Sequence, residues 1–172
     1  MSYNLISLTT SALSKNNIKS ICKLKDKEWR FGYKSQYEWF KSNVKKKDIH
    51  NLFFIKSRLI GYTLLRTRSC KISNTKKSLK YLLFDTLIID SKYRKKKHSN
   101  ILMHFNNTII KQKKYFSFLI CKQRLVSFYK KYGWIKLNTK NISVENRSFL
   151  RNCLIYNGKK IKKKIIYFFT NK

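Results

Sequence analysis

Apolar residues in the first half of the chain recur at two spacings, which separates candidate strands from candidate helices. Alternating or continuous apolar runs predict strands, and apolar positions three or four residues apart predict helices. By these patterns the chain opens with a short strand and two helices, at Tyr3–Leu8, Ser14–Leu24 and Gln36–Val44. Three strands rich in β-branched, Leu and aromatic residues follow, at Asn51–Lys56, Leu59–Thr67 and Tyr81–Asp90, with a tight hairpin at Ser57 and Arg58.

The second half of the chain alternates helices with strands. A predicted amphipathic helix over Lys97–Lys113 collects on one face the residues Ile101, Leu102, Phe105, Ile109 and Ile110. The apolar run Phe116–Cys121 is typical of a strand buried on both faces. A short helix at Leu125–Tyr132 ends at Gly133. The last predicted strands are Trp134–Leu137 and a terminal pair around Asn157 and Gly158, formed by Cys153–Tyr156 and Ile165–Thr170.

This order of elements predicts a mixed α/β fold, because an antiparallel block is followed by alternating strands and helices. The helical crossover between the strands at 81–90 and 116–121 makes these two strands parallel, with a right-handed connection. Ligands bind where such parallel strands part. A single domain over 1–172 is expected, since no repeat or linker divides the sequence and its 42% hydrophobic content supports one core.

The composition adds an unusual charge to this picture. The chain has 41 Lys and Arg against 7 Asp and Glu, a formal charge of +34. An AT-rich coding bias explains many of the lysines, together with the scarcity of Gly, Pro and Ala, but it does not explain the scarcity of Asp and Glu. We therefore expect an electropositive surface suited to RNA, nucleotide phosphates or acidic glycans.

The cysteines and termini narrow the class further. Cys22, Cys70, Cys121 and Cys153 are far apart with no C-x-x-C pair, which predicts reduced thiols used for packing and no metal site. No stretch has the length of a membrane span, and Met1 to Leu13 lacks the pattern of a signal peptide. These features predict a cytoplasmic protein that is a monomer or a homodimer.

The segment from Asp85 to Leu102, DTLIIDSKYRKKKHSNIL, is the first candidate site. It reads as a strand, a basic turn and a helix start. Free amides at a helix N-terminus bind anions, and the run from Arg94 to Lys97 adds positive charge. A solvated basic loop is the alternative interpretation, and for this segment alone it is the more common one.

The segment from Phe118 to Trp134, FLICKQRLVSFYKKYGW, changes that balance. With it, residues 50 to 140 resemble the GNAT superfamily of N-acetyltransferases. In this family an Arg/Gln-x-x-Gly-x-Gly/Ala helix start is followed, after the next strand, by Phe-Tyr-x-x-x-Gly-Phe/Trp. The resemblance implies an α/β, GNAT-like mixed sheet of about six to seven strands flanked by about four helices. It also implies acetyl-CoA as acyl donor and an amine as acceptor.

The same resemblance assigns cofactor-binding positions. The backbone at Leu87, Ile88 and Ile89 would pair with the pantetheine arm. Arg94 and the amides of the helix start would hold the diphosphate, at Lys95, Lys96, Lys97, His98, Ser99 and Asn100. Lys97 stands where the family has its first glycine, and Ser99 replaces its second small residue. A side chain at position 97 narrows the loop, although its ammonium adds attraction.

Two residues are candidates for catalysis. Tyr129 matches the tyrosine that often protonates the departing thiolate in the family, and the alternative is a partly buried core tyrosine. Asp85 lies mid-strand, where some relatives place a general base, and the alternative is a structural carboxylate. His50, His98 and His104 are weaker candidates, and His104 should face solvent or the flank of its helix.

The sequence thus predicts an N-acetyltransferase that moves an acetyl group to a primary amine by direct attack in a ternary complex. The positive charge favours an acidic acceptor, with nucleic acid as a secondary partner. The alternative is a catalytically degenerate GNAT-like basic protein that binds RNA or the ribosome, a possibility supported by Lys97 and by the charge.

Overall fold

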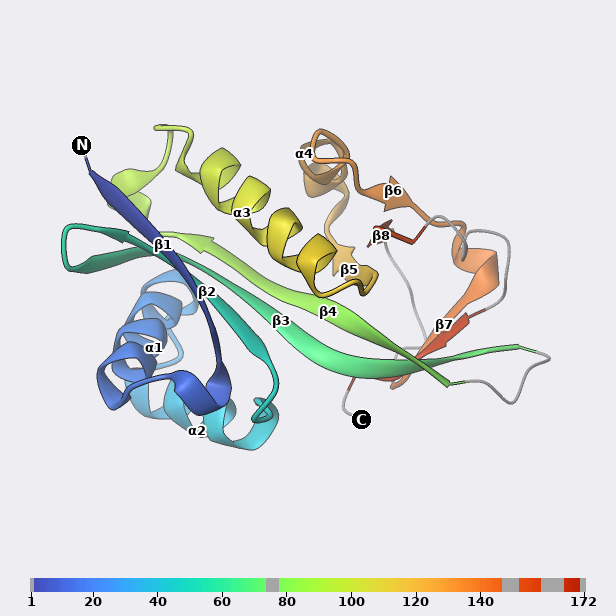
Figure 1. Ribbon diagram of the computed structural model, residues 1–172, viewed down its shortest axis with the longest axis horizontal. Helices are drawn as coiled ribbons and strands as arrows, with labels where there is room; N and C mark the ends of the chain where they lie inside the picture. The colour runs from blue at the N-terminus through green and yellow to red at the C-terminus, as the bar shows by residue number, and fades with distance from the viewer. Residues whose placement is uncertain (1, 74–77, 147–151, 159–165, 171–172) are drawn as a thin grey trace. The chain divides into compact units, whose positions relative to one another are not determined.

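A computed structural model describes residues 2–73, 78–146, 152–158 and 166–170 (Figure 1). The chain divides into two compact units. The first unit comprises Met1–Arg66 and Asp85–Asn106, and the second comprises Thr67–Phe84 and Asn107–Lys172. Two long strands, β3 (Arg58–Ile72) and β4 (Ser78–Ile89), run through both units.

The first unit contains a sheet with helices on both faces (Figure 1). Strand β1 (Tyr3–Thr9) is antiparallel to β2 (Ile49–Ile55), which is antiparallel to β3, and β4 follows β3. Helices α1 (Lys15–Trp29) and α2 (Tyr33–Asn43) pack against each other on one side. Helix α3 (His98–Gln112) lies on the other side.

Alternation along the strands gives each face of this sheet its own core. Leu52 and Ile88 belong to the cluster that includes Ile21 and Phe40 of α1 and α2. The next residues along the strands, Phe53 and Ile89, pack instead with Leu102 of α3. Since successive side chains of a strand point to opposite faces, both faces can be buried only if the strands are almost continuously apolar.

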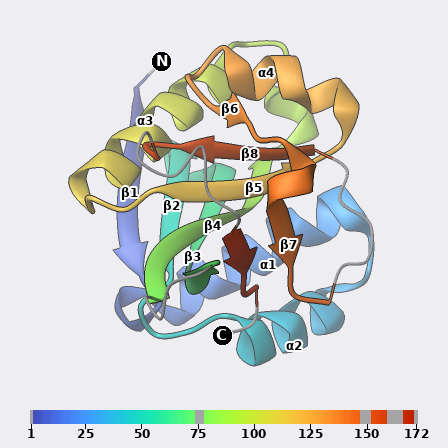
Figure 2. The same cartoon turned by 90° about the vertical axis from the view of Figure 1, so that its right-hand side faces the viewer.

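The second unit is built around β5 (Ser117–Cys121), which pairs with strands on both of its edges. It is parallel to β4 and antiparallel to β8 (Asn152–Tyr156). On its other edge β8 pairs antiparallel with the short strand β6 (Ile135–Lys136), as Figure 2 shows. Helix α4 (Val126–Lys130) follows β5. The parallel ladder is short, with two registered pairs, Leu82 with Ser117 and Leu83 with Phe118.

The mixed α/β fold expected from the sequence is confirmed, as are most element positions, but the C-terminal pairing was wrong. Strand β8 does not pair with β9 (Ile166–Phe168) across Asn157 and Gly158. Instead, β9 is antiparallel to β3 and parallel to β7 (Ile142–Val144), a strand that the pattern did not predict. Residues 159–165, which link β8 to β9 and include the predicted strand residue at 165, lie outside the described residues. The single domain over 1–172 stays a prediction.

Three of the four cysteines are buried in these cores, as expected for thiols used in packing: Cys22, Cys70 and Cys153. In the described ranges, no helix combines the length and apolar content that crossing a membrane requires.

Candidate active site

A cavity of about 470 Å³ lies at the C-terminal end of β4, and we call it the β4–α3 cavity. Nine of the ten positions predicted for cofactor binding line it: Leu87, Ile88, Ile89, Arg94, Lys95, Lys97, His98, Ser99 and Asn100. Lys96 is not part of the lining. Tyr93, which the motif did not single out, also lines the cavity. One strand end, one turn and one helix start therefore build a single hollow from consecutive residues.

The turn before α3 presents a row of unpaired backbone amides. Within the described residues, no hydrogen bond is donated by the main-chain N–H groups of positions 95 to 99. The carbonyl of Lys97 accepts hydrogen bonds from the amides of Asn100 and Ile101, at 2.9 and 3.3 Å, and so starts the helix. Free amides at the positive end of a helix dipole attract anions, so this turn can hold a phosphate group.

Two lysines of this turn adopt a left-handed backbone conformation. Lys95 has φ 65° and Lys97 has φ 58°. Such a conformation costs an L-residue about 1 kcal/mol or more, and glycine adopts it freely. The backbone at Lys97 therefore has the conformation that explains a glycine at this place in the family motif, and alternation of left- and right-handed residues makes an anion-binding nest.

Arg94 does not point its charge freely into the cavity. Its Nε donates a hydrogen bond to the carbonyl of Ile89 at 3.1 Å, and its guanidinium pairs with Glu28 of α1. The His98 ring makes a hydrogen bond at 2.9 Å with the carbonyl of Tyr93. These bonds connect the turn to β4 and to α1. Arg94 therefore both stabilises the turn and lines the cavity.

The end of β4 is anchored by Asp90, a residue the sequence marked only as a strand end. Its buried carboxylate accepts hydrogen bonds from Lys27 at 3.0 Å and from the Lys92 amide at 3.1 Å, and Arg58 lies 3.4 Å away. Burial alone would raise the pKa of Asp90, but these hydrogen bonds and positive charges bring the pKa below its ordinary value. Asp90 therefore holds the turn in place as an ionised group.

A second and larger cavity, of about 720 Å³, lies on the α1–α2 side of the first unit, and we call it the aromatic cavity. It is lined by Lys25, Trp29, Phe31, Ser35, Gln36, Trp39, Asp85 and Thr86. Asp85 and Thr86 immediately precede Leu87 on β4, so neighbouring residues of one strand line both cavities. The two cavities thus share β4 as a common wall.

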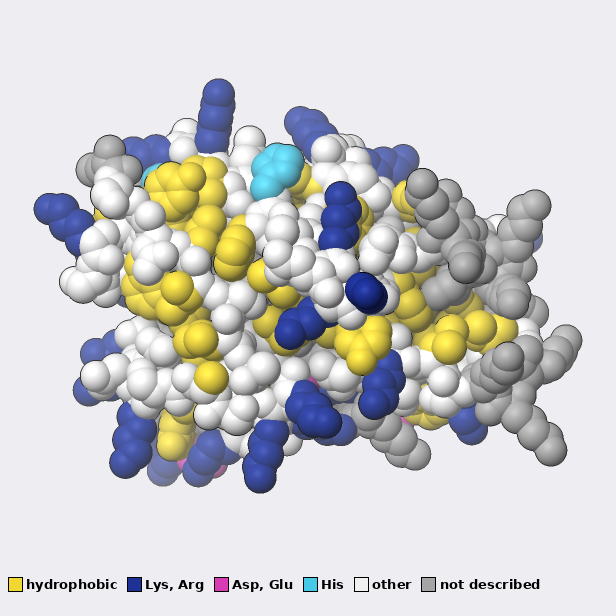
Figure 3. Space-filling view, viewed as in Figure 1, with side chains coloured by type: hydrophobic (Ala, Val, Ile, Leu, Met, Phe, Trp, Pro, Cys, Tyr) yellow, Lys and Arg dark blue, Asp and Glu magenta, His cyan; other side chains and the backbone are white. Residues whose placement is uncertain are grey.

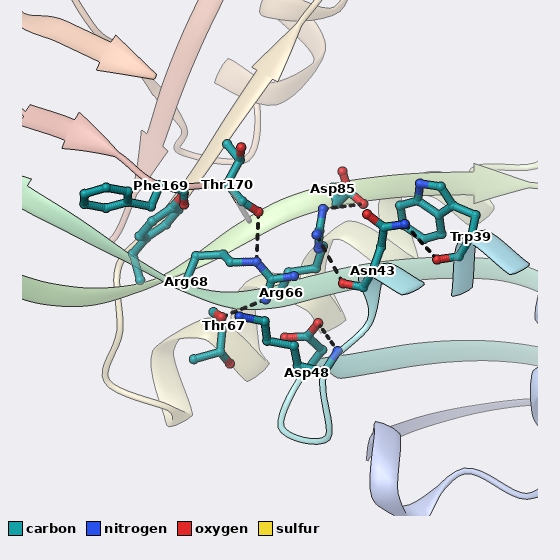
Figure 4. Close-up of polar contacts among 11 residues, drawn as sticks. Trp39, Asn43, Asp48, Arg66, Thr67, Arg68, Asp85, Phe169 and Thr170 are labelled. Carbon is teal, nitrogen blue, oxygen red and sulfur yellow. Dashed lines mark hydrogen bonds and ion pairs between the residues drawn. The ribbon is translucent and has the colours of Figure 1, made fainter. Parts of the chain in front are cut away.

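Asp85 is the carboxylate of the aromatic cavity, and its side chain is 27% exposed. Its Oδ2 lies 3.7 Å from the buried guanidinium of Arg66 (Figure 4). Arg66 in turn donates to the carbonyl of Asn43 at 3.1 Å, which fixes the guanidinium against α2. The charged neighbour of Asp85 is therefore a cation, although apolar residues follow Asp85 along the strand, because successive side chains of a strand point to opposite faces.

Lys25 brings a second cation into this cavity. It is 4% exposed, and its Nζ lies 3.5 Å above the ring centroid of Trp39 and 5.7 Å from that of Trp29. Burial lowers the pKa of Lys25 to about 8, with the charge of Asp85 acting in the opposite direction. A partly protonated amine and a carboxylate thus share one aromatic enclosure.

Gln36 supplies the remaining polar group of the aromatic cavity. It is 3% exposed, and its amide nitrogen has no hydrogen-bond partner in the part of the chain that the structure describes. An unsatisfied buried amide is costly, and a ligand that accepts a hydrogen bond would offset this cost. Sequence reasoning missed Lys25 and Gln36, although the spacing of Lys25 and Trp29, one helical turn apart, was visible.

His50 lies on β2 and is fully buried. Its Nδ1 is 2.8 Å from the Tyr62 hydroxyl, and its Nε2 is 2.9 Å from the Thr10 hydroxyl. Burial, with a smaller contribution from the charge of Lys25, lowers the pKa of His50 to about 4. We assign it a structural role as a neutral imidazole. His104, on the exposed side of α3, faces outward as expected.

Tyr129 lies in α4 of the second unit and is 7% exposed. Its ring meets Phe84 edge-on at 5.9 Å and lies 6.0 Å from the Trp134 ring. Burial, and to a smaller extent the nearby Cys121, raises the pKa of Tyr129 well above its ordinary value. Its hydroxyl makes no hydrogen bond to a described residue, so the phenol stays protonated and free to donate.

The fold that carries these features is similar to that of solved GNAT-type N-acetyltransferases. Escherichia coli YhbS, a GNAT-family N-acetyltransferase solved with CoA, matches 98% of this chain and 91% of its own at 10% identity, with a TM-score of 0.66. An acyl-CoA N-acyltransferase from Pseudomonas aeruginosa matches 90% of this chain and 97% of its own at 12% identity, with a TM-score of 0.65.

A third match is the PaiA N-acetyltransferase from Thermoplasma acidophilum, solved with coenzyme A. It covers 90% of this chain and 98% of its own at 18% identity, with a TM-score of 0.55. No protein-family model and no curated protein sequence matches the chain at a significant level. The likeness lies in the fold, because the sequences share few identical residues.

Proposed function

We propose that this protein is an N-acetyltransferase that moves an acetyl group from acetyl-CoA to a primary amine by direct attack in a ternary complex. The observation that carries the proposal is the row of unpaired amides at positions 95 to 99, because all of these residues except Lys96 line the cavity at the end of β4. The fold and the CoA found in matched structures support the same activity.

In this proposal the β4–α3 cavity takes the donor. The amides from Lys95 to Ser99 would receive the diphosphate, with the ammonium of Lys97 adding attraction. The backbone of Leu87, Ile88 and Ile89 would pair with the amide groups of the pantetheine arm in the manner of an added strand. Acetyl-CoA supplies the activated acyl group as a thioester.

The aromatic cavity takes the acceptor amine. Asp85 accepts a proton from the ammonium, because only the neutral amine is nucleophilic. The amine nitrogen then forms a bond to the acyl carbon, and the carbon–sulfur bond breaks. Tyr129 donates its proton to the departing thiolate, and a proton released by the new amide nitrogen restores the phenol. No covalent enzyme intermediate is required.

Isothermal titration with acetyl-CoA tests donor binding, with Lys97→Glu and Lys96→Glu as a matched pair. Both variants make the same charge change in one turn, but only Lys97 lines the cavity. We expect saturable binding that weakens at least roughly tenfold in Lys97→Glu and little in Lys96→Glu, because Lys97→Glu replaces an attractive charge beside the diphosphate with a repulsive one. Absence of saturable binding, or equal losses in the two variants, would refute the donor site.

A further inference from the structure

Exposed aromatic side chains are concentrated in one short segment of the first unit. Among the described residues, eight large apolar side chains are exposed, and four of them are Trp29, Phe31, Tyr33 and Tyr37. Phe31 is 70% exposed, the most of any large apolar side chain described. These four side chains come from the end of α1, the first half of α2 and the turn between them, and we call them the aromatic platform.

Uncompensated positive charges alternate with these rings in the sequence Trp29-Arg30-Phe31-Gly32-Tyr33-Lys34. Arg30 and Lys34 are exposed and make no ion pair with a described residue. The acidic side chains of the same segment are already engaged: Asp26 accepts from the Gly32 amide, Glu28 pairs with Arg94, and Glu38 pairs with Lys41. Glu28 and Glu38 are neutralised by these ion pairs, and Arg30 and Lys34 outnumber the remaining charge of Asp26, so the platform carries a small net positive charge.

The turn that carries the platform has a defined shape. Arg30 and Gly32 are both left-handed, with φ values of 54° and 84°. Asp26 secures both residues, because its carbonyl accepts the Arg30 amide at 2.7 Å and its carboxylate accepts the Gly32 amide at 2.7 Å. The rings of Tyr33 and Tyr37 are stacked, with centroids 6.2 Å apart and planes within 9° of parallel. The rings are thus held ready for a partner.

We propose that the aromatic platform binds single-stranded RNA. Flat aromatic rings interleaved with free cations match the two parts of an unpaired nucleotide, because bases stack on rings and phosphates pair with Arg and Lys. The overall charge of +34, visible as many Lys and Arg side chains on the face in Figure 3, adds long-range attraction. RNA is chosen over DNA because unpaired loops and ends are the usual targets of RNA recognition.

The composition of the platform argues against a membrane or an ordinary protein partner. A membrane-binding surface of this kind would expose Leu or Ile beside its aromatic residues, and the platform has neither. A protein interface of useful size would be expected to have an apolar centre free of cations, whereas Arg30 and Lys34 alternate with the aromatic residues along the chain and are exposed.

Trp29 and Phe31 belong both to the platform and to the lining of the aromatic cavity. An RNA strand bound on the platform would therefore place an unpaired nucleotide beside that cavity. This step rests on the proposed acetyl transfer, and it identifies the acceptor class as a primary amine attached to RNA.

Fluorescence anisotropy with a labelled oligouridine of about twelve nucleotides, without acetyl-CoA, tests the platform. We expect Phe31→Ala to weaken binding roughly tenfold and the double variant with Tyr33→Ala roughly a hundredfold, since each stacked base contributes about 1–3 kcal/mol. Tyr167→Ala, which removes an exposed aromatic ring of the second unit, should change the affinity less than about twofold. Lys34→Gln should weaken binding more than Lys130→Gln, although both remove one exposed charge.

Three results would overturn the proposal: no saturable binding of the oligouridine, equal loss in Phe31→Ala and Tyr167→Ala, or equally tight binding of a duplex of the same length. Binding to phosphatidylglycerol vesicles that Phe31→Ala abolishes, with RNA binding unchanged, would assign the platform to a membrane.

The acceptor class has its own readout, and the donor site provides an internal check. Tyr33→Ala, which changes the platform but not the lining of the aromatic cavity, should raise the KM for an oligoribonucleotide with a 3′-terminal amine but not for the same amine free in solution. Its affinity for acetyl-CoA should not change. RNA binding without transfer to any amine would refute the proposed function and leave the platform standing, whereas transfer to free amines without RNA binding would do the reverse.

Discussion

The two cavities of the first unit share β4 but are built in opposite ways. The β4–α3 cavity comes almost entirely from consecutive residues, 87 to 100, and its anion-binding groups are main-chain amides. The aromatic cavity joins residues 25 to 39 of α1, α2 and their turn to Asp85 and Thr86, and its chemistry lies in side chains.

This difference explains which site tolerates sequence change. An anion site made of backbone amides requires the turn and the helix start but few particular side chains. Position 97 can therefore be lysine, provided that the fold stabilises its left-handed conformation. The aromatic cavity depends on the identities of Lys25, Gln36 and Asp85. We therefore expect donor binding to survive substitutions that abolish acceptor chemistry.

The largest expected effect separates the two cavities directly. Asp85→Asn keeps the shape of the side chain but removes the proposed base, so kcat/KM should fall by about 10²–10⁴-fold. The affinity for acetyl-CoA, measured by titration, should stay the same because the donor cavity is intact. Glu38→Gln, which removes one exposed carboxylate from α2, is the matched control. A loss of acetyl-CoA affinity in Asp85→Asn would contradict the separation.

The next largest effect is expected at the proposed proton donor, Tyr129. Tyr129→Phe removes a protonated hydroxyl without changing the ring that packs on Phe84 and Trp134. We expect turnover to fall roughly a hundredfold with little change in acetyl-CoA affinity or melting temperature. Tyr132→Phe on the same segment is the control, and unchanged turnover in Tyr129→Phe would remove its proposed role.

A smaller effect concerns the buried imidazole of His50 and the pH dependence of stability. The pKa of His50 is lowered to about 4, so the unfolded state takes up a proton first as the pH falls. This contribution to stability is complete above an unfolded pKa of about 6.5 and is lost toward the folded value, with about 2 kcal/mol lost by pH 5.

Urea unfolding at pH 7 and pH 5 measures this loss. A His50→Gln variant should lose less stability between the two pH values than the parent protein, because the titrating group is gone. The exposed His104, replaced by Gln, should leave the difference as it is. Parallel losses in all three proteins would show that His50 is not the group responsible.

The smallest expected effect tests the left-handed backbone conformation of Lys97 in the β4–α3 cavity. Lys97→Gly should raise the free energy of unfolding by up to about 1 kcal/mol, because glycine relieves a left-handed conformation. The φ angle of Lys96 is not positive, so Lys96→Gly should lower the free energy of unfolding by a similar amount. Thermal unfolding of both variants provides the comparison, and destabilisation by Lys97→Gly equal to that of Lys96→Gly would contradict this account.

The sequence predicted the β4–α3 cavity better than the aromatic cavity for a physical reason. A strand end, a turn and a helix start are local, so the motif from Asp85 to Leu102 brought its own residues together. Lys25 and Gln36 reach Asp85 only because α1 and α2 pack on the same face of the sheet as β4, and no local pattern reports that packing. The wrong pairing of β8 and β9 has the same origin, since strand partners are chosen by tertiary contacts.

By itself, the amino-acid sequence determined the order and type of most elements, the mixed α/β class, the positive charge and the turn that exposes its amides. These follow from spacing and composition, which act within a few residues of one another. Only the tertiary structure decided that Arg94 ties the turn to Glu28, that Asp85 sits among cations, and that aromatic side chains enclose them. Such arrangements bring together segments that are far apart in the chain and bury them. Desolvation and charge–charge interactions have their largest effects in these buried places.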